Sequence, residues 1–285
     1  PPPPPPFSSR RRHTRSGPQS RGLGDVYKRQ QLEDINTAEN KKVFFASDFH
    51  LGTSADEPSI VREKKVVKWL RDIKSDAQHI FILGDIFDFW FEYKYTIPKG
   101  FTRLQGTLME LRDEGIPITF FSGNHDIWMF HYFQDEFDIP VYRDPAIVKI
   151  NDKKFLIGHG DGLGPGDRKY KFFKRLFENP VSQWMFKWIH PDIAFKIANR
   201  YSKKSRLKNL QKDHEFKGDD EWLLQYCKDV EENEHHDYYI FGHRHLPLIL
   251  DVNNNSRYIN IGDWIFSFTY GEFSDNEMQI KKFVD

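Results

Sequence analysis

A short apolar segment that ends in an acid and an imidazole constrains this chain more than any other feature of its sequence. Residues 43–47, Val-Phe-Phe-Ala-Ser, have the composition of a buried strand, and Asp48 and His50 follow directly. Residues at i and i+2 of extended backbone point to the same side, so these two side chains can bind one metal ion together. Open α/β sheets place their ligands at the carboxyl ends of such strands. The segment therefore predicts a strand that delivers metal ligands, if other strands supply partners.

Four more apolar runs end in polar motifs of the same kind. The motifs are Gly84-Asp85, Gly123-Asn124-His125-Asp126, Gly158-His159 and Gly242-His243-Arg244-His245. Each motif alone is more typical of a turn, a capped loop or an exposed strand end than of a ligand. Five of them, each after an apolar run, predict a dinuclear metal site. Asp, Asn and His suit ions such as Mn²⁺, Fe²⁺ and Zn²⁺, and the lack of thiolates argues against structural zinc.

Apolar periodicity alternates between strands and helices in the first half of the chain, which predicts a βαβ core. Asn151-Asp152 lies between two short apolar runs and predicts a hairpin turn. The last four strands are expected to form an antiparallel meander. Expected helices cover residues 57–73, 101–112, 219–232 and parts of 166–217; expected strands cover 43–47, 79–83, 118–121, 147–150, 154–157, 238–241, 248–252, 258–261, 264–270 and 277–283.

The composition limits the cellular setting. A single cysteine, Cys227, excludes an internal disulfide, fits a reducing compartment, and lies in a helical pattern that predicts a core position. No apolar run reaches the length of a transmembrane helix, and the start shows no hydrophobic core of a signal peptide.

Residues 1–30 differ from the rest of the chain. They begin with six prolines and hold seven basic residues against one acid, whereas residues 31–285 hold 35 basic and 41 acidic residues. A basic arm for nucleic acid is one interpretation. The segment resembles translated sequencing-adapter sequence, however, and we interpret it as a non-native or disordered tail, with one catalytic domain at 31–285.

A basic, aromatic and helical segment occupies residues 166–217, here called the insert. It holds 14 basic and 5 acidic residues, whereas the rest of residues 31–285 carries a net charge near −15. Such a segment suits an anionic amphiphile at a membrane surface. The alternative is a cap whose aromatic residues pack on the sheet and whose lysines face solvent. Because the chain enters the insert directly from the His159 loop, we expect the insert to act as a lid over the site.

The ordered motifs Asp-x-His, Gly-Asp, Gly-Asn-His-Asp, Gly-His and Gly-His-x-His resemble those of the calcineurin-like metallophosphoesterases over about residues 43–245. The resemblance implies an α/β protein, a four-layer α/β/β/α sandwich with an inserted helical cap. It also implies two divalent ions, of which Mn²⁺ is expected. One ion would be held by Asp48, His50, Asp85 and His245, and the other by Asp85, Asn124, His159 and His243.

The chemistry implied by this resemblance is hydrolysis by a hydroxide shared between the two ions. His125 would stand beside the leaving oxygen as proton donor or charge stabiliser, and Asp126 would orient it.

Within the family the chain is most similar to the UDP-2,3-diacylglucosamine diphosphatases of lipid A synthesis. The similarity rests on residues 84–90 (Gly-Asp-Ile-Phe-Asp-Phe-Trp), on residues 159–163 (His-Gly-Asp-Gly-Leu) and on the cationic insert. It implies cleavage at the α-phosphorus of UDP-2,3-diacylglucosamine, by an enzyme that is cytoplasmic and peripheral on the inner face of the bacterial inner membrane. The expected substrate-binding residues are Trp90, Asp167, Tyr170 and Arg200.

One departure leaves alternatives open. The best-known enzymes of that group have Arg where this chain has His125, so the substrate could be another phosphodiester or nucleotide-linked compound. A related nuclease is a second alternative, although nucleic acid is an unlikely partner because the aromatic residues have helical spacing rather than a strand platform. A non-catalytic scaffold is a third, and it conflicts with the complete ligand set.

Overall fold

The strand that leads to Asp48 and His50 is buried on both faces. It is β2 (Lys42–Ala46), and it lies in the middle of a six-stranded sheet. Val43 and Phe45 pack against a second sheet, whereas Phe44 and Ala46 pack toward helices. Burial of both faces explains why this run is apolar without alternation.

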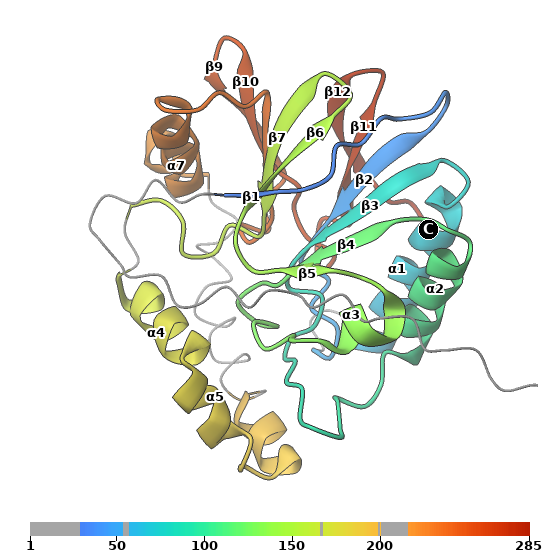
Figure 1. Cartoon of the computed structure of the whole chain (residues 1–285), viewed down its shortest axis with the longest axis vertical. Coiled ribbons are helices and arrows are strands. Elements are labelled where there is room, and N and C mark those ends of the chain that lie inside the picture. Colours follow the sequence, from blue (N-terminus) through green and yellow to red (C-terminus); the bar gives the residue numbers. More distant parts are fainter. Residues whose placement is uncertain (1–28, 54–56, 166–167, 199, 201–215) are drawn as a thin grey trace, which may run out of the picture.

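Two six-stranded sheets lie face to face in the computed structural model, which describes residues 29–53, 57–165, 168–198, 200 and 216–285 (Figure 1). The first sheet has the order β12-β11-β2-β3-β4-β5 and the second the order β1-β6-β7-β8-β10-β9. The remaining strands are β1 (Gln30–Gln31), β3 (Ala77–Leu83), β4 (Ile118–Phe121), β5 (Val141–Tyr142), β6 (Ala146–Ile150), β7 (Lys153–Gly158), β8 (Tyr238–Phe241), β9 (Leu248–Asn253), β10 (Ser256–Asn260), β11 (Thr269–Ser274) and β12 (Glu277–Lys282).

Helices cover the outer face of each sheet. The first sheet is covered by α1 (Ser59–Ile73), α2 (Thr102–Asp113) and α3 (Tyr132–Phe137), and the second by α7 (Trp222–Glu231), which follows the short 3₁₀ helix η1 (Gly218–Asp220) (Figure 1). Cys227 lies fully buried on α7, as predicted. The layers run helix, sheet, sheet, helix, which confirms the four-layer α/β/β/α prediction.

Parallel pairing brings the polar motifs to one end of the sandwich. β2, β3 and β4 pair in parallel in the first sheet, and β7, β8 and β10 pair in parallel in the second. The carboxyl ends of parallel strands meet at the same edge of a sheet. The predicted hairpin is also confirmed, since β6 and β7 are antiparallel neighbours on either side of Asn151.

The prediction of a strand at 264–270 and of one final meander is wrong. Residues 264–267 form a turn, because Asp263 Oδ1 accepts hydrogen bonds from the backbone N–H groups of Phe266 and Ser267. The four last strands form two hairpins in different sheets, since β10 pairs with β8 whereas β11 pairs with β2.

The N-terminal segment begins at Arg29 in the described part of the chain. Gln30 and Gln31 form β1 beside β6, and Arg29 Nη1 lies 3.3 Å from Glu234 Oε2. The predicted tail at 1–30 otherwise lies outside the described residues.

The insert is helical where it is described. It contains α4 (Arg168–Glu178), α5 (Pro180–Phe186) and helical residues 191–198, whereas residues 166–167, 199 and 201–215 lie outside the described residues. Among the described helices, no segment combines the length and apolar character that crossing a membrane requires.

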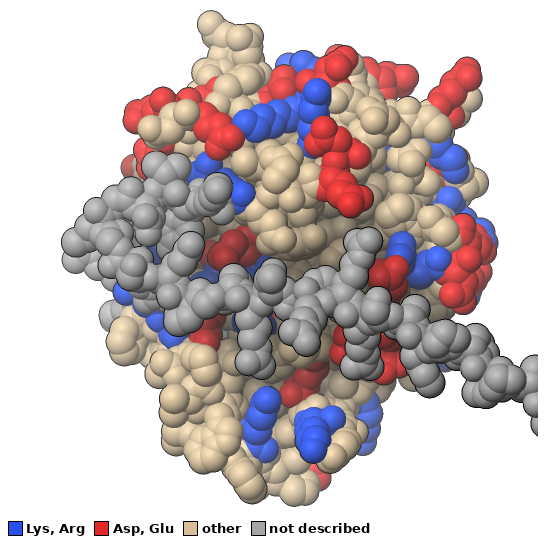
Figure 2. Space-filling view, in the orientation of Figure 1, with Lys and Arg blue, Asp and Glu red and all other residues tan. Residues whose placement is uncertain are grey.

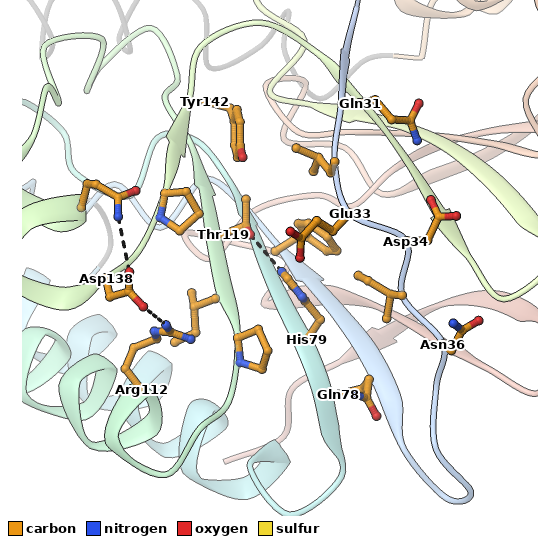
Figure 3. Close-up of a pocket in the computed structure, with 17 residues that line it drawn as sticks. Gln31, Glu33, Asp34, Asn36, Gln78, His79, Arg112, Thr119, Asp138 and Tyr142 are labelled. Carbon is orange, nitrogen blue, oxygen red and sulfur yellow. Dashed lines mark hydrogen bonds and ion pairs between the residues drawn. The ribbon is translucent and has the colours of Figure 1, made fainter. Parts of the chain in front are cut away.

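A cavity of about 610 Å³ lies between the N-terminal segment and β3, β4 and β5, and Figure 3 shows its lining. His79 on β3 lines it, with its ring 4.2 Å from that of Phe81 and Nε2 2.9 Å from Thr119 Oγ1. Burial, together with the positive charge of Arg112, lowers the pKa of His79 to about 4.

We expect His79 to make the stability of the fold depend on pH. Because the pKa is about 4 in the folded protein and 6.5 in the unfolded chain, the unfolded chain binds more protons between these values. Stability is therefore full above pH 6.5 and falls as the pH drops, by about 2 kcal/mol between pH 7 and pH 5. Urea denaturation at both pH values measures the free energy of unfolding. Between pH 7 and pH 5, this free energy should fall by about 2 kcal/mol less in His79→Gln than in the wild type. Equal losses in the two proteins would contradict the assignment, and the exposed His190→Gln serves as control.

Candidate metal centre

Five predicted ligands have a backbone conformation that their residue types rarely adopt. Asp48, His50, Asp85, His243 and His245 have φ angles of 56°, 45°, 52°, 66° and 52°. Non-glycine residues with positive φ are uncommon and concentrate at functional sites. Each of these ligand loops therefore turns sharply as it leaves its strand.

Two motif glycines allow the loops to approach each other closely. A Cβ atom on Gly123 would lie 2.6 Å from the backbone nitrogen of Asp85, and one on Gly242 would lie 2.6 Å from Asp48 Oδ2. Any side chain at these positions would push the ligand loops apart.

One group of ligand atoms comes from both sheets. His245 Nε2 lies 3.1 Å from Asp48 Oδ1 and 3.1 Å from His50 Nε2. His50 Nε2 also lies 3.6 Å from Asp85 Oδ2. The ligand atoms of Asp48, His50 and His245 lie close enough to one another to share one ion.

A second group lies on the other side of Asp85. His159 Nε2 is 3.3 Å from Asp85 Oδ2 and 3.3 Å from Asn124 Oδ1, and the ring centroids of His159 and His243 are 5.1 Å apart. Asp85 Oδ2 therefore lies within 3.6 Å of an imidazole nitrogen of each group. The structure brings together all seven predicted ligand residues, with Asp85 between the two groups.

The buried polar atoms of the centre fit divalent ions. Asp48 Oδ1 and His50 Nδ1 are buried and make no hydrogen bond to the described residues, which is costly for polar groups unless a ligand serves them. The donors are carboxylate and amide oxygens and imidazole nitrogens, the set that suits Mn²⁺, Fe²⁺ and Zn²⁺.

The carboxylates of the centre are held in their charged form. Burial opposes ionisation of Asp48 and Asp85, but His245 next to Asp48 and His159 next to Asp85 hold both pKa values below the usual range. Burial would likewise lower the pKa of His50, yet the neighbouring carboxylates of Asp48, Asp88 and Asp85 raise it to about 9. The buried carboxylates attract positive charge, which in the metal-free protein comes from imidazolium protons.

In three of the four predicted ligand histidines, the second ring nitrogen lies near an oxygen atom. His159 Nδ1 lies 2.7 Å from the carbonyl oxygen of Leu83, which can only accept, so Nδ1 carries the proton and Nε2 is free to bind a metal. His50 Nδ1 lies 3.7 Å from Asp88 Oδ1, and His245 Nδ1 lies 3.7 Å from Asp263 Oδ2. Such supporting groups fix the orientation of metal-binding imidazoles.

Sequence reasoning missed Asp88, and it interpreted Gly262-Asp263-Trp264 as more typical of a turn than of a site loop. Asp88 lies three residues after Asp85 in the same loop, and nothing in its spacing marks it as a partner of an imidazole. Gly262-Asp263 does follow a strand, as the ligand motifs do, and this was the available signal. Asp263 has two roles: its Oδ1 accepts the hydrogen bonds that form the turn at residues 264–267, and its Oδ2 lies near His245 Nδ1.

The prediction that Asp126 orients His125 is wrong. His125 Nδ1 instead lies 3.0 Å from the carbonyl oxygen of Asp88 and 3.6 Å from Asp88 Oδ1. The carboxylate of Asp126 accepts hydrogen bonds from the backbone N–H groups of Gly123, Asp85, Ile86 and Phe87, at 2.6, 3.3, 2.7 and 3.3 Å. Asp126 therefore ties the loop after β4 to the loop after β3.

The prediction that Trp90 lines the substrate site is also wrong. Trp90 is fully buried among Phe87, Tyr132 and Phe133, and its Nε1 donates to Glu92 Oε1 at 3.2 Å. Its spacing after Asp85 suggested a site residue, but the loop turns it into the core.

The other expected substrate residues lie in the insert. The Tyr170 ring lies 6.3 Å from that of His243, and its hydroxyl donates to Asp161 Oδ2 at 2.6 Å. Arg200 is exposed, and its role stays a prediction. Asp167 lies outside the described residues.

The insert contacts loops of both sheets. At its start, Lys174 Nζ lies 2.7 Å from Asp161 Oδ2, after β7. Further along, the Phe186 ring lies 4.5 Å from that of Trp128, after β4, and the Phe195 ring lies 5.0 Å from that of Phe89, after β3. The insert therefore bridges the loops that carry the metal ligands.

Known proteins share this arrangement of motifs. Residues 41–247 match the family model described as calcineurin-like phosphoesterase. A UDP-2,3-diacylglucosamine hydrolase of Porphyromonas gingivalis is 34% identical over 259 residues, covering 86% of this chain and 98% of that protein. A protein of the same name from Histophilus somni is 28% identical over 243 residues, covering 84% of this chain and 99% of that protein. The chain belongs to the calcineurin-like phosphoesterase family.

Proposed function

We propose that this chain hydrolyses UDP-2,3-diacylglucosamine at its α-phosphorus and releases 2,3-diacylglucosamine 1-phosphate and UMP. The observation that carries the proposal is the similarity to the Porphyromonas gingivalis hydrolase. That similarity covers 98% of the relative and 86% of this chain, so it spans both the ligand motifs and the insert. Family membership supports the reaction class, and the names of the relatives support the substrate.

The two groups of side chains would hold two divalent ions, and we propose Mn²⁺. Asp48, His50 and His245 would hold one, His159, Asn124 and His243 the other, and Asp85 would contact both. Bound divalent ions polarise phosphoryl oxygens and lower the pKa of water at the site.

His125 is the proposed group beside the leaving oxygen. The carbonyl oxygen of Asp88 holds its Nδ1 at 3.0 Å, which fixes the ring and directs Nε2 away from this contact. The His125 ring lies edge-on to that of His50, with centroids 4.8 Å apart, so it stands at the margin of the first group of ligands. We propose that His125 contacts the substrate from this position, and its ring nitrogen also lies close enough to His50 and Asp88 for the three to share an ion.

The insert is the proposed binding surface for the lipid. Eleven large apolar side chains among the described residues of the insert are exposed, including Trp184 at 59% and Trp188 at 77%. Figure 2 shows an uncharged surface over α5 with Lys and Arg beside it, and α4 carries both apolar and basic residues. An apolar surface flanked by cations suits anionic lipids. We therefore propose a cytoplasmic protein that binds peripherally to the inner face of the bacterial inner membrane.

Two variants should separate metal binding from proton transfer. We expect Asp85→Ala to abolish activity and metal loading together, because Asp85 lies between both groups of ligands. We expect His125→Ala to keep its metal but to lose activity by about 10²–10⁴-fold, the usual contribution of a general acid. Metal content by mass spectrometry and turnover of bis-p-nitrophenyl phosphate measure the two effects.

The matched control for this pair is Asp251→Asn, which removes an exposed carboxylate on β9. It should keep both metal and activity. If Asp85→Ala retains activity, the dinuclear mechanism is wrong. If His125→Ala loses its metal, His125 is a ligand.

The substrate assignment is tested directly. Purified protein incubated with UDP-2,3-diacylglucosamine and Mn²⁺ should release UMP, detected by chromatography, and no UMP should form when a chelator replaces Mn²⁺. Turnover of bis-p-nitrophenyl phosphate without release of UMP would reject the lipid substrate and retain the phosphoesterase chemistry.

Membrane binding should depend on the exposed tryptophans. We expect the double variant Trp184→Ser/Trp188→Ser to bind vesicles of phosphatidylethanolamine and phosphatidylglycerol at least about tenfold more weakly than the wild type, because each ring loses an apolar contact with the lipid. Cosedimentation measures the binding. Ile249→Ser removes an exposed apolar residue of β9 outside the insert and should bind like the wild type. Equal binding of the double variant would rule out this surface.

A further inference from the structure

Arg244 stands between two predicted ligands in an unusual setting. His243 and His245, on either side of it, both have positive φ, at 66° and 52°. The Arg244 side chain is itself buried, with 1% exposure. His243 and His245 both have a positive φ, which non-glycine residues rarely adopt. Such a conformation persists only when surrounding contacts hold the loop, and Arg244 lies between the two residues.

A buried carboxylate holds Arg244 among the described residues. Arg244 Nε donates to Glu221 Oε1 at 2.8 Å and Nη2 donates to Glu221 Oε2 at 3.1 Å. Glu221 has 0% exposure, and the Trp222 ring lies 4.7 Å from Arg244 Cζ. A planar guanidinium paired through two hydrogen bonds has a fixed direction as well as a fixed position.

Glu221 lies at the base of the insert. It follows η1, where the chain returns from the insert, and it precedes α7. The other end of the insert reaches the same place, because Gly164 packs so closely against the backbone oxygen of Trp222 that a Cβ could not fit. Lys171 of α4 donates to the carbonyl oxygen of Gly164, and Lys217 Nζ lies 4.3 Å from the Trp222 ring.

We propose that Glu221 and Arg244 are positioning residues that couple the base of the insert to the orientation of His243 and His245. This inference rests on the proposed metal-dependent function and concerns residues outside the predicted ligand set. The pair fixes the loop after β8 from the side of the insert, whereas Asp48 Oδ2 fixes it from the other sheet by accepting from the His243 backbone N–H at 3.0 Å. Loss of the pair would let both imidazoles move relative to Asp85 and Asp48.

The test measures Mn²⁺ affinity in the folded protein. Glu221→Gln keeps the size of the side chain but removes its charge, and Arg244→Met removes the guanidinium. Circular dichroism first sets a temperature at which each metal-free variant is fully folded. Calorimetric titration with Mn²⁺ at that temperature should then show an affinity at least about tenfold lower than that of the wild type, the usual effect of losing a group that orients a ligand.

The matched control is Lys153→Met. It removes the ion pair between Lys153 Nζ and Asp237 Oδ1, 3.0 Å apart, at the opposite end of β8 from the ligand loop. This variant should bind Mn²⁺ like the wild type even if its melting temperature falls.

The outcomes separate this inference from the proposed function. Variants that unfold at a lower temperature but bind Mn²⁺ with an affinity within twofold of that of the wild type would overturn the inference. Glu221 and Arg244 would then contribute to stability alone. A wild type that binds Mn²⁺ but releases no UMP from the lipid substrate would overturn only the substrate assignment. A wild type that binds no Mn²⁺ would overturn both the inference and the metal-dependent mechanism.

Discussion

Hydrogen bonds between the ligand loops hold the metal centre in shape. The backbone N–H of Asp48 donates to the carbonyl oxygen of Gly84 at 3.0 Å, that of His50 to Asp85 at 2.9 Å, and that of Gly242 to His159 at 3.0 Å. Strained backbone conformations cost roughly 1 kcal/mol or more each. Five such ligands together approach the net stability of a whole domain, about 5–15 kcal/mol. The loops can keep this geometry only because each one is bonded to its neighbours.

The sequence was sufficient to predict which side chains meet at the candidate centre, because their signal is local. Each ligand follows an apolar run that is buried on both faces, and parallel pairing brings the ends of these runs together without further information. The supporting residues could not be predicted in this way. Asp88 and Asp263 act through the direction in which their loops turn, which depends on hydrogen bonds between segments far apart in the chain.

The wrong predictions have the same origin. Asp126 and Trp90 were assigned from their positions in motifs, but the loop after β3 turns the indole into the core and brings its own N–H groups to the Asp126 carboxylate. Burial, with the charge of Asp85 added, raises the pKa of Asp126 to about 7, and the N–H groups oppose this rise. The final strands were misplaced because spacing within a run does not show which sheet receives it.

In the proposed function, the surface that would bind the lipid lies outside the loops that carry the predicted metal ligands. The ligand loops are buried and fixed, whereas the insert exposes apolar side chains that the body of the protein does not require for its own packing. Its anchoring contacts, such as Lys174 with Asp161 and Phe186 with Trp128, lie at the rim of the metal centre. The exposed apolar surface lies beyond these anchors on α4 and α5. If the insert binds the lipid as we propose, a change in that surface would alter lipid binding, while the contacts between the ligand loops stay the same.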